Sequence, residues 1–194
     1  MKFKIFNKLV ILRNPILIKK LPTLATLGLT NKTTDNYFLP FFDYDEVEYK
    51  VVLEDVDFLQ KNFDIGSVII NVSSEEKELS GELVGNYHVI GFTKFTFPEI
   101  REIINLSRCH SYFKQGWKFQ QRCWVLRILE KTDFKSNLDV KPKVRFKTLV
   151  KSKTNRVANL GMILFFEKLF GLKLKHLFDK VDDQEEVEII SYLT

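Results

Sequence analysis

Basic and aromatic side chains are interleaved through residues 108–131. The aromatic members are Tyr112, Phe113, Trp117, Phe119 and Trp124. The basic members that we expect to contact RNA are Arg108, Lys114, Lys118, Arg122 and Arg127. Such a mixture suits RNA, because cationic groups meet phosphates while rings stack on unpaired bases. Apolar residues of this segment also alternate in part, so a packed hairpin with Phe119 and Trp124 in the core stays open.

A second basic run covers residues 141–156. Its candidate RNA-binding residues are Lys143, Arg145, Lys147, Lys151, Lys153 and Arg156. Residues 144–150 predict a strand, on which Arg145 and Lys147 would share one face while Val144, Phe146 and Thr148 occupy the other. One face could then be buried while the other holds phosphate. The alternative is an edge strand that its charges protect from pairing with other chains.

Charge is polarised along the chain. Residues 1–34, which include a further RNA-binding candidate, Lys32, hold seven basic and no acidic side chains, and residues 101–175 hold 18 basic against five acidic ones. Residues 35–100 hold four basic against 14 acidic side chains, and residues 176–194 hold one against six. The basic segments would attract RNA phosphate by counterion release, and the acidic ones suit water or protein neighbours.

Residue types for catalysis or metal binding are sparse. Cys109 and Cys123 form no CxxC pair, and Cys109-His110 lacks a second pair of ligands at zinc spacing. His88 falls in a predicted strand, where a structural role is expected, and no phosphate-binding glycine motif occurs. The sequence therefore predicts a protein that is not an enzyme and holds no metal or cofactor. Its two cysteines provide no disulfide framework and fit a reducing compartment.

Length and hydropathy bound the fold. The chain has 194 residues and is 45% hydrophobic, enough for one domain with a substantial core. No run approaches about 18 apolar residues without a charge, so no membrane span is expected. We expect an α+β fold: a mixed or antiparallel sheet with helices packed on one face, plus the basic aromatic segment as an addition.

Apolar periodicity places the expected elements along the chain. Strands are predicted at residues 43–53, 65–72, 88–96 and 144–150, and helices at residues 54–63 and 155–174. Residues 23–36 and 73–85 are polar or charged and predict loops. Gly85 and Asn86 can take positive φ, which predicts a tight turn with Tyr87 packed beneath it, and Pro98 can open a helical turn.

Two motifs, Gly85-Asn86-Tyr87 and Phe97-Pro98-Glu99-Ile100, are separated by nine residues. This arrangement resembles the signature of the universal large-subunit ribosomal protein five family, found in the central protuberance of the ribosome. Weaker landmarks occur in the family's order. Residues 3–14 resemble its first strand, residues 50–59 a later strand and the helix after it, and residues 144–174 its closing strand and helix. The resemblance implies a strand at residues 4–12 and a shortened first helix at residues 15–25.

The resemblance implies a structural protein of the large ribosomal subunit. Its implied partners are ribosomal RNA, neighbouring proteins of the central protuberance, a small-subunit bridge protein and, transiently, the tRNA in the peptidyl site. The family's loop nearest the tRNA corresponds here to Lys77, Ser80, Gly81, Gly85 and Asn86. This loop is acidic, with Lys77 as its cation, so a weak or altered tRNA contact is expected.

Residues 101–142 extend a connection that is short in the family. We therefore expect a single domain over residues 1–194, in which residues 101–142 are an attachment that the core sheet can form without. Residues 179–194 are expected to be an acidic C-terminal tail.

Composition also bears on location. Phe, Tyr, Met, Ile, Asn and Lys total 75 residues, whereas Gly, Ala, Arg and Pro total 22, a bias that AT-rich coding DNA produces in organelle genomes. The basic, acid-free N-terminus fits a transit peptide or an uncleaved signal. We expect the protein in the mitochondrial matrix, within the ribosome, as an imported or organelle-encoded chain. The other interpretation is a free-standing RNA-binding or RNA-processing subunit of an organelle.

Overall fold

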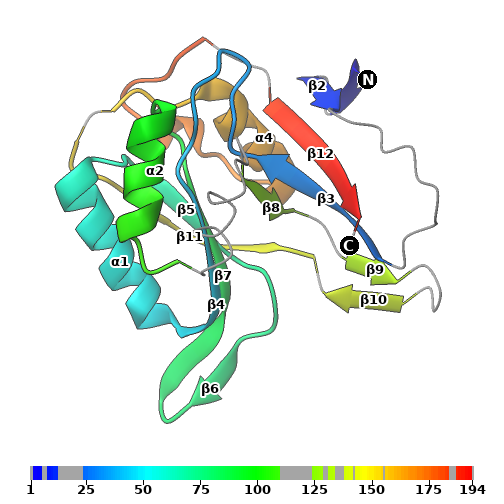
Figure 1. The fold of residues 1–194 in the computed structure, drawn as a ribbon, viewed down its shortest axis with the longest axis vertical. Helices are drawn as coiled ribbons and strands as arrows, with labels where there is room; N and C mark the ends of the chain where they lie inside the picture. Colours follow the sequence, from blue (N-terminus) through cyan, green and yellow to red (C-terminus); the bar gives the residue numbers. More distant parts are fainter. Residues whose placement is uncertain are drawn as a thin grey trace.

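The chain forms two β-sheets with helices packed against them (Figure 1). The computed structural model describes residues 2–5, 8–12, 24–109, 124–128, 131–133, 138–141, 143–154, 156–183 and 187–193. Strands and helices are segregated along much of the chain and most strand pairs are antiparallel, so the expected α+β class is confirmed.

One sheet has five strands, in the order β11-β5-β7-β4 with β6 paired to β7. Its members are β4 (Phe41–Glu48), β5 (Val68–Val72), β6 (Lys77–Leu79), β7 (Glu82–Gly91) and β11 (Arg145–Val150). All of its described pairs are antiparallel. Every residue of β5 is buried, because this apolar strand lies between β11 and β7 and is covered on both faces.

The other sheet has seven strands and brings the two ends of the chain together. Its members are β1 (Lys2–Ile5), β2 (Lys8–Leu12), β3 (Leu24–Thr30), β8 (Val125–Arg127), β9 (Lys131–Asp133), β10 (Leu138–Lys141) and β12 (Val187–Leu193). β12 runs parallel to β2 and antiparallel to β3, between them.

The strands β3 and β12 of this sheet fall in segments for which the sequence predicted a loop, a helix or a tail. The expected acidic tail, residues 179–194, contains β12, because the β-branched and aromatic types of residues 187–193 favour a strand. The expected loop at residues 23–36 contains β3, and residues 24–25 of the expected helix 15–25 belong to that strand. The rest of that expected helix lies outside the described residues.

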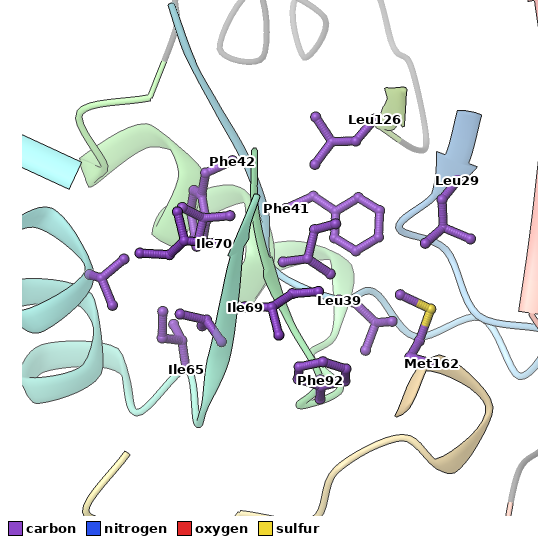
Figure 2. Packing of buried hydrophobic residues seen from close by; sticks show 14 of the residues in the cluster. Leu29, Leu39, Phe41, Phe42, Ile65, Ile69, Ile70, Phe92, Leu126 and Met162 are labelled. Atoms are coloured by element: carbon purple, nitrogen blue, oxygen red, sulfur yellow. The ribbon is translucent and has the colours of Figure 1, made fainter. Parts of the chain in front are cut away.

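Helices lie on both faces of the five-stranded sheet. They are α1 (Tyr49–Phe63), α2 (Phe97–Leu106), α4 (Leu160–Phe170) and the 3-10 helix η1 (Lys175–Leu177). Phe42 and Ile70 point toward the α1 side, whereas Phe41 and Ile69 point to the opposite side (Figure 2). On that opposite side the ring of Phe146 lies 5.9 Å from the ring of Phe170 in α4. The expected single helical face therefore describes α1 and α2 but not α4.

The predicted strand at residues 43–53 ends early, at Glu48, and α1 begins at Tyr49. Val52, Val56 and Leu59 are fully buried at helical spacing, while Leu53 is 38% exposed. Burying this helical stripe stabilises the segment more than the alternate pattern that suggested a strand. Residues 50–53, matched to a strand of the ribosomal family, are therefore helical here.

The tight turn lies at Ser80 and Gly81 instead of Gly85 and Asn86. Ser80 and Gly81 have φ of 53° and 85°, and they join β6 to β7 as a two-residue hairpin turn. Gly85 is a strand residue without positive φ, and a Cβ there would lie 3.1 Å from Glu76 Cγ and 3.3 Å from the hydroxyl oxygen of Tyr87. Close approach of Glu76 and Tyr87, not turn geometry, therefore favours glycine at this position.

Pro98 opens α2 as predicted, and the helix continues well beyond Ile100. Thr96 and Glu99 form a capping box at its start, and Ile103 and Ile104 bury in the core. Downstream, Leu126 is 1% exposed and β8 pairs with β3. The described part of residues 101–142 therefore contributes helix, core side chains and sheet strands, and formation of the core sheet without this segment stays a prediction.

Asn31 joins the two sheets where the chain passes from β3 toward β4. Its side chain is fully buried; the amide Nδ2 donates to the Leu39 carbonyl at 3.1 Å and Oδ1 accepts from the Trp124 amide at 2.8 Å. Its backbone bonds the same two residues, accepting from the Leu39 amide at 2.7 Å and donating to the Trp124 carbonyl at 2.9 Å. Asn31 thus ties the segment that leads into β8 to the segment that leads into β4.

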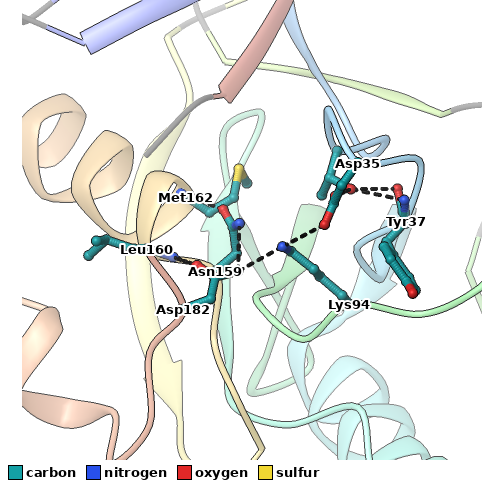
Figure 3. Close-up of polar contacts among 8 residues, drawn as sticks. Asp35, Tyr37, Lys94, Asn159, Leu160, Met162 and Asp182 are labelled. Atoms are coloured by element: carbon teal, nitrogen blue, oxygen red, sulfur yellow. Dashed lines mark hydrogen bonds and ion pairs between the residues drawn. The ribbon is translucent and has the colours of Figure 1, made fainter. Parts of the chain in front are cut away.

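Lys94 forms a second tie, between the loop after β3 and the start of α4 (Figure 3). Its Nζ lies 3.0 Å from Asp35 and 2.8 Å from Asp182. Asp182 also accepts from the backbone amide of Leu160, the first residue of α4, at 2.8 Å. Asn159 is the N-cap of that helix and accepts from the Met162 amide. Lys94 therefore holds a carboxylate that helps to cap α4.

We expect Asn31→Ala to lower the free energy of unfolding by about 2–4 kcal/mol, because it leaves the Leu39 carbonyl and the Trp124 amide buried without partners. Urea denaturation followed by circular dichroism measures this change. The matched control is Asn105→Ala on the exposed face of α2, which should change stability little. A loss below about 1 kcal/mol would contradict the role given to Asn31.

The Lys94 tie predicts a pH window. Burial alone would raise the pKa of Asp35, but hydrogen bonds from Thr33 and Lys94 outweigh it and hold the pKa below its ordinary 3.8. Burial alone would lower the pKa of Lys94, but Asp182 and Asp35 raise it above its ordinary 10.5. The stabilisation from Asp35 is therefore present above pH 3.8 and lost as pH falls through its lowered pKa. That from Lys94 is present below pH 10.5 and lost as pH rises through its raised pKa.

Lys94→Met should accordingly destabilise the protein most at neutral pH, with the difference from the parent shrinking toward strong acid and strong base. Urea titrations over a pH series measure that difference. Lys173→Met, at an exposed lysine after α4, is the control and should give a small, nearly flat difference. A Lys94→Met difference that is equally flat would contradict the assigned ion pairs.

Candidate nucleic-acid interface

β11 is the edge strand that carries the second basic run. It pairs with β5 and has a bulge between Phe146 and Thr148. Arg145 lies opposite Val72, and Phe146 opposite Asn71 on the face toward α4. Lys147 occupies the bulge and points to the other face, where its Nζ lies 4.4 Å from the ring centre of Tyr49 in α1. The predicted strand is confirmed, but the bulge breaks the predicted alternation at Thr148.

Several basic residues meet acidic residues that are distant in sequence. Lys147 pairs with Glu76 at 2.6 Å and Arg156 with Asp64 at 2.6 Å. These pairs join the basic segment 101–175 to the acidic segment 35–100. Part of the charge separation seen in the sequence is therefore cancelled in space.

Glu76 fixes Lys147 in a cluster at the base of the β6–β7 hairpin. It accepts from Lys147 at 2.6 Å and from the Tyr87 hydroxyl at 2.8 Å. Burial alone would raise the pKa of Glu76, but the hydrogen bonds from Lys147 and Tyr87 and the charge of Lys147 lower it. Burial and the neighbouring Glu76 both raise the pKa of Tyr87. Because Lys147 is committed to this cluster, it is a weaker candidate for phosphate than the sequence suggested.

Four cations remain exposed along β11 and the turn that follows it. These residues, called the basic edge, are Lys143, Arg145, Lys151 and Lys153. Within the described residues none of them forms an ion pair. An edge strand of this kind can resist pairing with another chain and can also present charge to a polyanion. Lys32 lies apart from the basic edge in the chain, in the half-buried loop after β3.

The first basic run is only partly described. Lys114, Lys118 and Arg122 lie outside the described residues. Arg108 is exposed and pairs with Glu54 at 3.2 Å. Arg127 is 7% exposed and donates to the backbone carbonyl of Ser73, so its expected role as a surface ligand of RNA is corrected.

Trp124 is buried and is therefore not placed to stack on RNA bases. It is 3% exposed, its backbone bonds Asn31, and its ring lies 6.4 Å from the Phe97 ring of α2. The alternative of a packed core residue is therefore the right one for Trp124. Phe119, for which the same alternative was open, lies outside the described residues.

The loop that the resemblance placed near tRNA is the β6–β7 hairpin. Lys77, Ser80 and Gly81 are exposed near its tip, and Figure 1 shows the hairpin projecting from the sheet. Gly85 is buried in β7, and Asn86 lies beside it, where its Oδ1 accepts from the Glu46 amide at 2.9 Å. That bond supports a bulge in β4. The two groups of residues expected to form one loop are therefore separated, with only the first at the tip.

A polar cavity of about 70 Å³ lies where β11 ends, beside the C-terminus of α1. Its lining includes Ser67, Thr93, Lys151, Ser152, Thr154 and Arg156. Phe92, Ala158, Leu177, Phe178 and Asp179 complete it. Two cations predicted as RNA ligands, Lys151 and Arg156, are thus brought to one cavity with four hydroxyl side chains.

The sequence analysis predicted the cations of this cavity as RNA ligands but not its hydroxyl residues. Ser152 and Thr154 alternate with Lys151 and Lys153, and this alternation of hydroxyl and cationic side chains could have indicated an anion-binding segment. Ser67 and Thr93 carried no such signal, because they reach the cavity only through sheet pairing and the path of the chain after α1. The Ser152 amide donates to the Ser67 hydroxyl at 3.0 Å and closes one side.

Among the described side chains, no three His, Cys, Asp or Glu residues group closely enough to hold a metal ion. His88 is 5% exposed and its Nε2 lies 3.5 Å from Asp43. No helix in the described part of the chain is long and apolar enough to cross a membrane.

A scan against protein-family models, a search of curated proteins and a search of solved structures each found no match to this chain. The fold and the interface therefore rest on the residues and geometry given above.

Gly66 lies against Thr93 of the cavity lining, and its substitution should be costly. It has φ of +74°, and a Cβ there would lie 2.2 Å from the Thr93 hydroxyl oxygen. Gly66→Ala should therefore lower the free energy of unfolding by about 2–4 kcal/mol, through backbone strain and overpacking together. Urea denaturation measures the loss.

Gly81→Ala separates these two causes. Gly81 has φ of +85°, but a Cβ there would meet nothing within 4 Å. Its alanine variant should lose only the cost of the backbone conformation, about 1 kcal/mol. Equal losses at Gly66 and Gly81 would show that contact with Thr93 contributes nothing.

Proposed function

We propose that this protein is a structural constituent of the large ribosomal subunit of mitochondria, with its basic edge against ribosomal RNA. The observation that carries the proposal is a set of exposed cations on and beside one edge strand that form no ion pair with another described residue: Lys143, Arg145, Lys151 and Lys153. Cations held on a rigid strand meet the regularly spaced phosphates of RNA at little entropic cost.

The order of elements supports the ribosomal part of the proposal. A strand and helix, β4 and α1, precede the hairpin; β7 leads into α2 at the Phe97-Pro98-Glu99-Ile100 motif; and β11 and α4 follow. This order agrees with the landmarks of the universal large-subunit ribosomal protein five family, except that residues 50–53 are helical and that residues 3–14, matched to one strand, include the end of β1 and all of β2, which pair antiparallel. Neighbouring proteins of the central protuberance and a small-subunit bridge protein are the further partners that this assignment implies.

Contact with tRNA is the weakest part of the proposal, because of charge. The tip of the β6–β7 hairpin would lie nearest the peptidyl-site tRNA, yet Glu75, Glu78 and Glu82 surround Lys77 there. A phosphate backbone would be repelled by this tip. The proposed contact is therefore transient, with affinity for the ribosome supplied by the basic edge.

A free-standing RNA-binding or RNA-processing subunit is the second candidate. The seven-stranded sheet favours it, because the resemblance to the ribosomal family does not account for that sheet. Both candidates require RNA binding, but they differ in how firmly the protein stays with the large subunit.

Sedimentation distinguishes the candidates. Tagged protein from its own cells should co-sediment with large-subunit RNA through high-salt gradients. Arg145→Gln/Lys153→Gln should leave the particle at lower salt, and in binding assays with large-subunit RNA it should reduce the slope of log affinity against log salt by about 2.

The matched control is Lys50→Gln/Lys61→Gln, which removes the same charge from the exposed side of α1 and should leave the slope unchanged. Parent protein that washes off the large subunit at high salt would favour the processing subunit. An unchanged slope in the Arg145→Gln/Lys153→Gln variant would remove the basic edge as the interface.

A further inference from the structure

The cavity at the end of β11 is built by segments far apart in the sequence. Ser67 follows α1, Thr93 follows β7, and Lys151 to Thr154 form the turn after β11. The turn is held internally, because the hydroxyls of Ser152 and Thr154 lie 2.9 Å apart and the Thr154 amide donates to Ser152 Oγ. The position of the cavity's polar groups is therefore fixed by the fold.

Thr93 places an unused hydroxyl in this cavity. The residue is 5% exposed, and among the described residues its side chain has no hydrogen-bond partner. Gly66 leaves the space that the hydroxyl occupies. The hydroxyl is open to the cavity, where water or the oxygen atoms of a ligand satisfy it.

The charges around the cavity favour an anion. Lys151 is exposed and free of ion pairs within the described part of the chain. Arg156 uses Nε to bind Asp64, and a guanidinium has further N–H donors beyond that one. Asp64 lies outside the lining and is held by Arg156 and by the Thr154 hydroxyl, whereas Asp179 is the acidic residue of the lining. Lys153, in the same turn, adds a further positive charge.

We propose that this cavity binds a phosphate group, held by Lys151 and Arg156 and by the hydroxyls of Thr93 and Ser67. The inference rests on the proposed function in one respect, that the phosphate belongs to the backbone of an RNA strand. The cavity, about 70 Å³, is several times the roughly 10–15 Å³ that one water needs, so a tetrahedral oxyanion fits it. Phosphate accepts several hydrogen bonds at once, which matches a lining of cations and hydroxyls.

Inorganic phosphate tests the cavity without RNA. In a nitrogen-15 NMR titration of the whole chain, the amides of Ser67, Ser152, Lys153 and Thr154 should shift together and saturate, whereas added chloride at equal ionic strength should not shift them. Thr93→Val keeps the shape of the side chain and removes the hydroxyl, and it should weaken phosphate binding about tenfold. Amides that do not shift in the parent protein would overturn the inference.

An RNA oligomer and its uncharged methylphosphonate analogue test the source of the phosphate. Lys151→Gln should reduce the salt slope of RNA binding by about 1, the control Lys50→Gln at the other end of α1 should not, and the analogue should leave the cavity amides unshifted. If RNA binds but its slope is the same in Lys151→Gln, the cavity is not a contact and the inference fails while the proposed function stands.

The opposite result is equally informative. If inorganic phosphate shifts the cavity amides but the parent protein binds no RNA, the phosphate site is supported and RNA is excluded as its source. In that case the proposed function fails independently of the site.

Discussion

The buried amide of Asn31 determines how the two sheets meet. A polar side chain with no exposure must satisfy its donor and acceptor inside the protein, and Asn31 does so on the backbones of Leu39 and Trp124. These partners lead into β4 and β8, one in each sheet. Because both bonds must form together, the amide admits one relative placement of the chain segments at this junction. The apolar layer between the sheets, including Leu29 and Leu126, packs around that placement (Figure 2).

A second buried polar group organises the other face of the five-stranded sheet. Asp55 of α1 is 1% exposed and accepts from the Tyr44 hydroxyl at 2.6 Å and from the Arg108 amide at 2.7 Å. It thus ties α1 to β4 and to the chain just after α2. Burial, followed by the charge of Asp55, raises the pKa of Tyr44 well above its ordinary value, so the hydroxyl stays a donor. Both helices on this face are therefore fixed relative to the sheet.

The fold also decides which charges are available to a partner. Glu76, Asp64 and Glu54 take up Lys147, Arg156 and Arg108, while Arg127 turns into the core. Among the residues of β11 and its turn, Lys143, Arg145, Lys151 and Lys153 stay exposed and form no ion pair with another described residue, and they lie beside a cavity with oxygen-binding groups. Charges that are separate along the chain are therefore partly neutralised in space, and the four cations of this edge are left for a partner.

Sequence alone determined the elements whose signals are local. The apolar run of β5, the capping residues Thr96 and Glu99 with Pro98 at the start of α2, and the alternation of β11 before its bulge each follow from neighbouring residues. The α+β class followed from the same signals. The expected turn at Gly85 was wrong because a glycine serves close packing as well as positive φ, and local sequence does not distinguish the two uses.

Tertiary structure alone decided what depends on distant partners. Local residue types favour strands at β8 and β12, but their pairing with β3 and its register depend on segments far apart in the sequence. The candidate site shows the same dependence on distant partners. The cations of residues 143–156 were predicted from the sequence, but only the fold pairs Lys147 with Glu76 and turns Arg127 inward to the Ser73 carbonyl. Thr93 and Ser67 joined Lys151 only because strand pairing places the ends of β5, β7 and β11 together. Hydrogen-bonded register between distant segments is the physical quantity that a linear pattern does not carry.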